Sequence, residues 1–191
     1  QCYTSFQAQH HRSGVNAIKC TADGTVFASG GQDGAVHFWD AVSNRRVNRL
    51  ANAHGGEPVH SLQWSRNVNY LMSGGGDGVG RIWDIRTGKE IQSVGTGQRS
   101  KKISVCWPHG ERFALVGNSS DISMYDMKTG QQVQKSIGGY GRATETFAYS
   151  PSHPTFAVAS ADGKCRIYDI VNQAQTARSA QGGSARIRGK Y

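Results

Sequence analysis

The chain has 191 residues and a formal net charge of +9 at pH 7, which favours partners that carry phosphate or carboxylate groups. Its hydrophobic residues never form an apolar run approaching the 18 residues that a membrane-spanning helix needs. The four cysteines form no Cys-x-x-Cys pair, so their spacing supports neither a zinc site nor a redox motif. We therefore predict no metal and no cofactor.

An aromatic residue followed by Asp recurs along the chain at steps of 44, 42 and 43 residues. The aromatic residues of these pairs are Trp39, Trp83, Tyr125 and Tyr168. The residues six positions earlier are Asp33, Asp77, Ser119 and Asp162. A fixed period in this range is typical of repeat architectures, in which each unit is one supersecondary element.

Each of the first two repeats predicts four short strands. The first strand alternates apolar and polar residues, as half-buried strands do. A polar turn leads to the second strand, and an Asp-Gly turn leads from the second to the third. The predicted strands of the first repeat are residues 15–20, 25–31, 35–40 and 45–51. Those of the second repeat are residues 59–64, 69–75, 79–84 and 89–95.

Four strands per 43 residues with a Trp-Asp ending resembles the WD40 repeat, the blade of a β-propeller. The resemblance implies an all-β fold, with about four blades visible over residues 1–170. Because propellers of this family usually close with about seven blades, we expect a longer protein whose N-terminal part supplies the others. Residues 171–191 are basic and poor in apolar side chains, so we expect a disordered tail.

The WD40 resemblance implies a structural role for one set of His, Asp and Trp side chains. In this family they form a hydrogen-bonded cluster that ties three strands of a blade together. Gly31 and Gly75 stand where the family usually has Ser or Thr, so we expect each cluster to lack one partner. The residues that we assign to these clusters are His10, Asp33, Trp39, His54, Asp77, Trp83 and Asp162.

Two catalytic interpretations compete with this structural one. His10, Asp33 and Ser13 could suggest a hydrolase, but no Gly-x-Ser-x-Gly elbow accompanies them, and a nucleophile would not repeat with the period. The glycine-rich segment 73–84 lacks the Gly-Lys-Ser/Thr ending of a phosphate-binding loop. We therefore predict a protein that is not an enzyme.

Several strings are similar to the WD40 subunit of cleavage stimulation factor, the complex that acts in pre-mRNA 3′-end processing. They are QCYTS at residues 1–5, SNR at 43–45, AH at 53–54, LMSGGGDG at 71–78, TGK at 87–89 and YSPSHPTF at 149–156. The resemblance implies a nuclear, non-enzymatic subunit that binds a helical-repeat scaffold subunit and other 3′-processing proteins, with pre-mRNA contact as a further expectation. In that family a homodimer forms through an N-terminal segment that this sequence does not contain.

Two basic surfaces follow from the order of strands in a blade. The turn between the second and third strands and the connection to the next blade lie at the same end of a propeller. We therefore expect a partner or RNA face that contains Gln32, Arg99, Lys101 and Lys102. Arg45 and Arg49, with Arg46 between them, are expected on the outer strand, at the rim. A peptide-recognition propeller of a chromatin or ubiquitin-ligase complex remains an alternative, because this fold hosts many functions.

Overall fold

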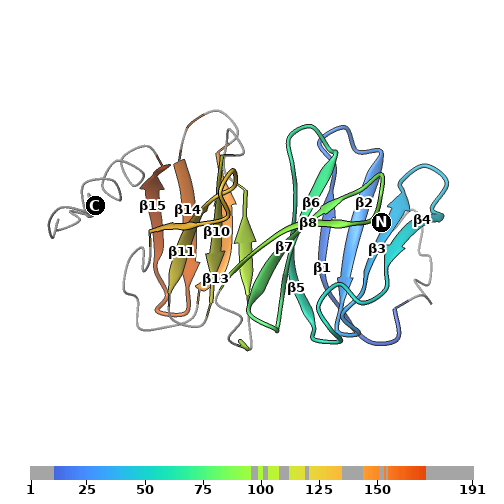
Figure 1. Cartoon of the computed structure of the whole chain (residues 1–191), viewed down its shortest axis with the longest axis horizontal. Helices are drawn as coiled ribbons and strands as arrows, with labels where there is room; N and C mark the ends of the chain where they lie inside the picture. Colours follow the sequence, from blue (N-terminus) through green and yellow to red (C-terminus); the bar gives the residue numbers. More distant parts are fainter. Residues whose placement is uncertain are drawn as a thin grey trace, which may run out of the picture.

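The computed structural model describes residues 11–95, 99–100, 103–107, 112–118, 121–134, 144–150, 153 and 155–170. This part of the chain is all-β and forms four separate antiparallel sheets, which follow one another in chain order (Figure 1). Each sheet is one blade, and we number the blades one to four. No helix in the described part is long and apolar enough to cross a membrane.

Blades one and two are complete four-stranded meanders, and their strands pair in sequence order. Both turn from the second to the third strand through a glycine with positive φ, Gly34 (72°) and Gly78 (81°), a conformation that suits glycine. The strands of blade one are β1 (Val15–Cys20), β2 (Val26–Gly31), β3 (Val36–Asp40) and β4 (Arg46–Leu50). Those of blade two are β5 (Val59–Trp64), β6 (Tyr70–Gly75), β7 (Val79–Asp84) and β8 (Glu90–Gly95).

Blades three and four have the same meander order, with shorter or fewer strands in the described residues. Blade three consists of β9 (Ser104–Cys106), β10 (Phe113–Gly117), β11 (Ile122–Asp126) and β12 (Gln132–Gln134). Blade four consists of β13 (Thr144–Tyr149), β14 (Thr155–Ser160) and β15 (Cys165–Asp169). The expected all-β arrangement of about four blades is confirmed.

The core of the protein lies between the blades, because a single narrow sheet cannot bury its own apolar face. Three apolar clusters each join two consecutive blades. In the first, Phe38 of blade one meets Trp64 of blade two, with ring centroids 5.9 Å apart. The second joins blades two and three around Met72 and Trp107, and the third joins blades three and four around Met124 and Phe156. The blades therefore form a row, with blade one and blade four at opposite ends (Figure 1).

Candidate functional site

Blade one contains a chain of four hydrogen-bonded side chains, which we call the blade-one tetrad: Trp39, Ser29, His11 and Asp33. The indole Nε1 of Trp39 donates to Ser29 Oγ over 2.9 Å. Ser29 Oγ lies 2.8 Å from His11 Nε2, and His11 Nδ1 lies 3.0 Å from Asp33 Oδ1. The tetrad links β3, β2, the segment before β1 and the turn between β2 and β3.

The hydrogen bonds of this tetrad assign the tautomer of His11. Because Ser29 accepts from the indole, its hydroxyl donates to His11 Nε2, which leaves Nδ1 protonated to donate to Asp33. Asp33 also accepts from the backbone N–H groups of Arg12 and Ala35. Partial burial works against the charged carboxylate, but these backbone bonds and His11 outweigh it and lower the pKa of Asp33.

Blade two repeats this arrangement with Trp83, Ser73, His54 and Asp77, the blade-two tetrad. The indole of Trp83 donates to Ser73 Oγ over 2.8 Å, and Ser73 Oγ lies 2.8 Å from His54 Nε2. His54 Nδ1 lies 2.9 Å from Asp77 Oδ1. His54 is fully buried, and this burial lowers its pKa in spite of the nearby carboxylate, so the imidazole stays neutral at pH 7.

Arg81, four residues after Asp77, adds a charge to the blade-two tetrad. Its guanidinium donates to Asp77 Oδ2, and its Nε lies 3.1 Å from Glu90 Oε2 on the outer strand. Burial raises the pKa of Asp77, but the hydrogen bond from Arg81 and the contact with His54 prevail, so the net shift is downward. The carboxylate of Asp77 therefore stays charged next to a neutral imidazole.

The two tetrads correct the sequence prediction at two points. The histidine that bonds Asp33 is His11, one residue after the predicted His10, which lies outside the described residues. His54 and Asp77 are 23 residues apart, but His11 and Asp33 are 22 apart. The spacing differs because connecting loops tolerate a change of length by one residue.

The second correction concerns the expected missing partner. Ser29 and Ser73, four residues before each Asp, complete the tetrads, so neither cluster lacks a hydroxyl. Gly31 and Gly75 have a different reason to be glycine. A Cβ on Gly31 would lie 2.4 Å from His11 Nδ1, and one on Gly75 would lie 2.2 Å from the His54 ring. The imidazoles therefore occupy the space that a side chain would need at these positions.

The described residues of blades three and four form no tetrad. Tyr125 and Tyr168 replace the two tryptophans, and the strand position of the tetrad serine is occupied by Val116 and Val158. In blade four, Asp162 forms an ion pair with Arg166, four residues later, at 2.5 Å, and this hydrogen bond lowers the pKa of Asp162 to about 2. The predicted cluster residue Asp162 is thus tied to an arginine.

One group of side chains in blade one has the composition of a metal site. Ligand atoms of His11, Asp33 and His37 lie within 4.8 Å of one another. Both ring nitrogens of His11 are already used in the tetrad, and the positive charges of Arg46 and Arg49 act on His37. We therefore interpret His11 and Asp33 as members of the tetrad, with His37 packed beside them.

The predicted partner face is partly described. Gln32 is exposed in the turn between β2 and β3, and Arg99 is exposed in the connection between β8 and β9. Ser100, next to Arg99, donates its backbone N–H to the carbonyl of Gly76 over 2.9 Å, which places this connection beside the equivalent turn of blade two. Arg99 also pairs with Glu57 at 3.0 Å. Lys101 and Lys102 lie outside the described residues.

A row of three arginines marks the rim of blade one. Arg46 and Arg49 lie on β4, while Arg45 directly precedes the strand instead of lying on it; all three are exposed. Within the described part of the chain, none of the three forms an ion pair. In contrast, Arg81 and Arg166 both pair with carboxylates. The arginine row (Arg45, Arg46 and Arg49) is therefore an uncompensated positive surface.

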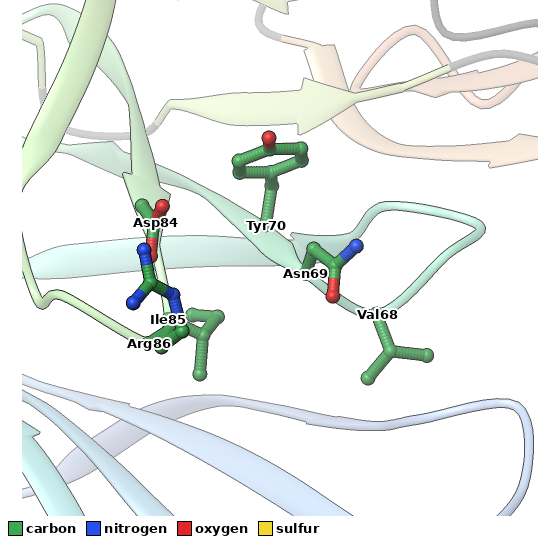
Figure 2. Close-up of a pocket in the computed structure, with 6 residues that line it drawn as sticks. All are labelled: Val68, Asn69, Tyr70, Asp84, Ile85 and Arg86. Atoms are coloured by element: carbon green, nitrogen blue, oxygen red, sulfur yellow. The ribbon is translucent and has the colours of Figure 1, made fainter.

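An open pocket of about 450 Å³ lies at the opposite end of blade two from the predicted partner face. Figure 2 shows Val68 and Ile85 directed towards blade one, with the Tyr70 ring on the other side. Val68 has a φ of 63°, where the equivalent turn of blade one has Gly24 at 72°. A β-branched residue with positive φ is strained. Sequence reasoning missed this pocket, although a valine in place of the turn glycine was a visible signal. Its lining consists of Val68, Asn69, Tyr70, Asp84, Ile85 and Arg86.

Comparison with known proteins agrees with this geometry. Residues 1–40, 45–84 and 133–169 match the WD40 family, described as WD domain, G-beta repeat. The chain belongs to the WD40 family. WD40 domains mediate protein–protein interactions, and members of this family are generally not enzymes. The matched residues include all described strands of blades one and four, and all strands of blade two except β8.

The curated WD40 relatives have varied roles. Actin-interacting protein 1 of Drosophila melanogaster is 26% identical over 158 residues, which cover 81% of this chain and 26% of the relative. Cell division cycle 20.6, cofactor of APC complex, of Arabidopsis thaliana is 30% identical over 128 residues, which cover 65% of this chain and 29% of the relative. The chain thus spans about a quarter of the length of these relatives.

A designed protein shows the same fold. The crystal structure of the computationally designed Ika4 protein superposes with a TM-score of 0.69 at 22% sequence identity. The superposition covers 86% of this chain and 96% of the designed one. At this identity the similarity concerns the fold alone, and it supports the arrangement of the blades in a row.

Proposed function

We propose that this chain is part of a non-enzymatic WD40 scaffold subunit of the pre-mRNA 3′-end cleavage and polyadenylation machinery in the nucleus. The proposal is supported by the strings at residues 43–45, 71–78 and 149–156, which are similar to the WD40 subunit of cleavage stimulation factor. In this proposal the scaffold binds a helical-repeat subunit and lies next to the pre-mRNA. The tetrads stabilise the blades and take no part in chemistry.

The observation that carries the RNA side of this proposal is the arginine row. Three exposed guanidinium groups, which form no ion pair with any described carboxylate, form a local positive field, and phosphate groups neutralise such a field with release of counterions. The other outer strands that the structure describes, β8 and β12, lack this feature. On β8, for example, Glu90 pairs with Arg81. The rim of blade one is therefore the described surface that is best suited to an RNA backbone.

Binding to single-stranded U- or GU-rich RNA tests this role by fluorescence anisotropy in a salt series. Replacing Arg45, Arg46 and Arg49 with Glu should weaken binding and reduce the slope of log K against log salt by about 2, since each lost phosphate contact removes roughly 0.7. The matched control replaces Arg86, Lys89 and Lys128, which are exposed in turns, with Glu at the same change of net charge. If both triple variants lose the same affinity, the arginine row has no specific role.

The protein side of the proposal is tested by affinity purification from nuclear extract. We expect to recover a helical-repeat scaffold and polyadenylation factors, and to lose them when Arg99 and Gln32 on the predicted partner face are replaced with Glu and Lys. The second candidate, a peptide-recognition propeller, is favoured by relatives that are named as cofactors of the APC complex. Recovery of ubiquitin-ligase or chromatin components in place of 3′-processing factors would support that candidate and reject the first.

A further inference from the structure

The open pocket of about 450 Å³ belongs to blade two, which packs against blade one on one face and against blade three on the other. Its walls come from two turns, one between β5 and β6 and one between β7 and β8. The backbone N–H of Ile85 donates to the carbonyl of Asn69 over 3.0 Å and ties these turns together. The pocket therefore does not depend on the blades at the two ends of the row.

The equivalent turns of blade one have the same backbone but smaller side chains. In blade one, Asp23 Oδ1 accepts from the N–H of Thr25 over 3.1 Å, and in blade two Asn67 Oδ1 accepts from the N–H of Asn69 over 3.1 Å. The walls of the pocket therefore consist of side chains that blade one lacks. Blade two has Val68, Asn69, Tyr70, Ile85 and Arg86 where blade one has Gly24, Thr25, Val26, Ala41 and Val42.

Val68 is a strained residue in the wall of this pocket. It has a φ of 63°, and the equivalent Gly24 has a φ of 72°. A β-branched residue is disfavoured in this region, whereas glycine adopts it freely. Because Asn67 fixes the turn as Asp23 does in blade one, the turn itself does not require a valine. Strained backbone of this kind is concentrated at ligand sites, so the strain and the pocket together indicate a ligand.

The pocket has apolar groups on two sides. Figure 2 shows the half-buried Tyr70 ring on one side of the opening and the aliphatic side chains of Val68 and Ile85 on the other. Proteins hold a splayed-out nucleobase by stacking it on aromatic and apolar side chains and by hydrogen-bonding its edges. The apolar part of this pocket suits a flat aromatic ring.

The polar groups of the pocket lie at its ends, with Asp84 and Arg86 at one end and Asn69 at the other (Figure 2). The backbone N–H of Thr87 donates to Asp84 Oδ1 over 2.8 Å, and this bond, with the nearby charge of Arg86, lowers the pKa of Asp84, so the carboxylate is charged at pH 7. Arg86 is exposed and forms no ion pair with any carboxylate that the structure describes. A strong acceptor and a strong donor therefore lie side by side.

We propose that this pocket binds a single guanine base of single-stranded RNA. Guanine presents two donors, N1–H and the N2 amino group, beside two acceptors, O6 and N7, which match Asp84 and Arg86. Adenine has an acceptor at N1 and would place it against the carboxylate. The inference rests on the proposed function for its RNA contact. Arg45 lies in the turn between β3 and β4, equivalent to the turn with Arg86, so the arginine row and the pocket meet the same end of adjacent blades.

Fluorescence anisotropy with short uridine oligonucleotides that carry one central guanosine, inosine or adenosine tests the base preference. The guanosine oligonucleotide should bind about tenfold more tightly than the adenosine one, as a bidentate contact to a base provides. Inosine lacks the N2 amino group and should fall between them. Equal affinities for guanosine and adenosine would overturn the proposal.

Two variants connect this preference to the pocket. Asp84→Asn keeps an oxygen for the N–H of Thr87 but presents an amide to the base, so the tenfold preference should disappear. Val68→Gly keeps the turn that Gly24 forms in blade one, and it should weaken guanosine binding several-fold. The control is Lys89→Gln, an exposed residue of the same turn that does not line the pocket, and it should keep the preference. Urea denaturation confirms that each variant is folded. A preference that survives Asp84→Asn would overturn the proposal.

The same probes separate failure of this inference from failure of the proposed function. The salt series on the arginine row and its control uses uridine-only RNA, so that Arg86 has no guanine to bind. Salt-dependent binding without base preference would overturn the guanine site and leave the arginine row intact. GMP that binds as tightly as the oligonucleotide would identify a free nucleotide as the ligand and overturn the RNA contact. Loss of a co-purifying protein from Asp84→Asn, with nucleotide binding unchanged, would identify a peptide site instead.

Discussion

Blades one and two differ from blades three and four in how the third strand is tied to the rest of the sheet. In the first pair, an indole, a hydroxyl, an imidazole and a carboxylate form one continuous chain of hydrogen bonds. In the second pair, Tyr125 and Tyr168 replace the indole, and Val116 and Val158 replace the hydroxyl. Serine and tryptophan thus change together within one chain.

The physical reason is the cost of an unpaired buried polar group. A buried serine without the indole, or an indole without the serine, would leave a donor or acceptor unsatisfied, at about 1–3 kcal/mol. Replacing both with Tyr and Val removes the indole N–H and the serine hydroxyl together, and the new tyrosine hydroxyl has its own partner, which in blade three is Ser123 beside Tyr125. The difference between the two pairs of blades therefore indicates that the tetrad acts as a unit, which is stable when complete or when fully replaced, and unstable when only one member is changed.

Removing the histidine from a complete tetrad should have the largest effect. In a His54→Ala variant, Ser73 and Asp77 both lose their central partner inside blade two, so we expect a loss of about 3 kcal/mol in the free energy of unfolding. Urea denaturation measures this change. His153→Ala, at an exposed position, is the control and should stay within about 0.5 kcal/mol of the unchanged chain. Equal losses in the two variants would contradict a special role for the tetrad.

As the pH falls, blades one and two should lose stability before the carboxylates begin to protonate. Burial lowers the pKa of His37 to about 4, and the charge on His11 contributes further to this shift. Burial also lowers the pKa of His54. Because the unfolded chain binds protons at these histidines near pH 6.5, stability is fully present above that pH and falls between about pH 6.5 and 4. For His37 the loss is at most about 3 kcal/mol.

Urea midpoints measured from pH 7.5 to 4 test this expectation. His37 is 1% exposed and is surrounded by His11, Asp33, Arg46 and Arg49, so its replacement must be compared at each pH. A His37→Gln variant should lose less stability across this range than the unchanged chain does. If the two pH profiles are parallel, protonation of His37 is not the cause.

The fold could be predicted from the sequence, because the repeat period and the alternation of apolar residues follow directly from how the strands of each blade are arranged. The positions of Asp33, Asp77, Trp39 and Trp83 in their blades follow from the same period. The loops between blades are less constrained, and a shift of one residue made the prediction choose His10 where the tetrad uses His11.

The remaining errors depend on the direction of side chains. Ser29 and Gly31 both lie on β2, but only the structure shows that the space beyond Gly31 is filled by the His11 ring. The exposure of Ile18 and Ile167 was also not predictable, since both have the alternation of an ordinary core strand. A local pattern identifies an apolar face, whereas its burial depends on which neighbour is present.

A double-mutant cycle in blade two tests this comparison directly. It introduces the Tyr and Val that blades three and four have at the positions of Trp83 and Ser73. Trp83→Tyr alone and Ser73→Val alone should each cost about 2 kcal/mol, since each leaves buried polar groups unsatisfied. Changing both should cost less than the sum of the two by about 1 kcal/mol. The cycle is measured by urea denaturation at pH 7.5. Strictly additive losses would show that the joint replacement in blades three and four has no energetic basis.

The smallest effect is expected for the arginine that follows each turn. Arg166 pairs with Asp162 at the surface of blade four, whereas Arg81 joins Asp77 to Glu90 beside the buried His54. The ion pair of Arg166 is partly buried but screened by solvent, so Arg166→Met should raise the pKa of Asp162 from about 2 towards its ordinary value and lower the urea midpoint only slightly. NMR titration of the carboxyl carbon measures this shift. Arg81→Met should lower the urea midpoint more than Arg166→Met does. Equal midpoints for the two variants would mean that Arg81 contributes no more to stability than Arg166.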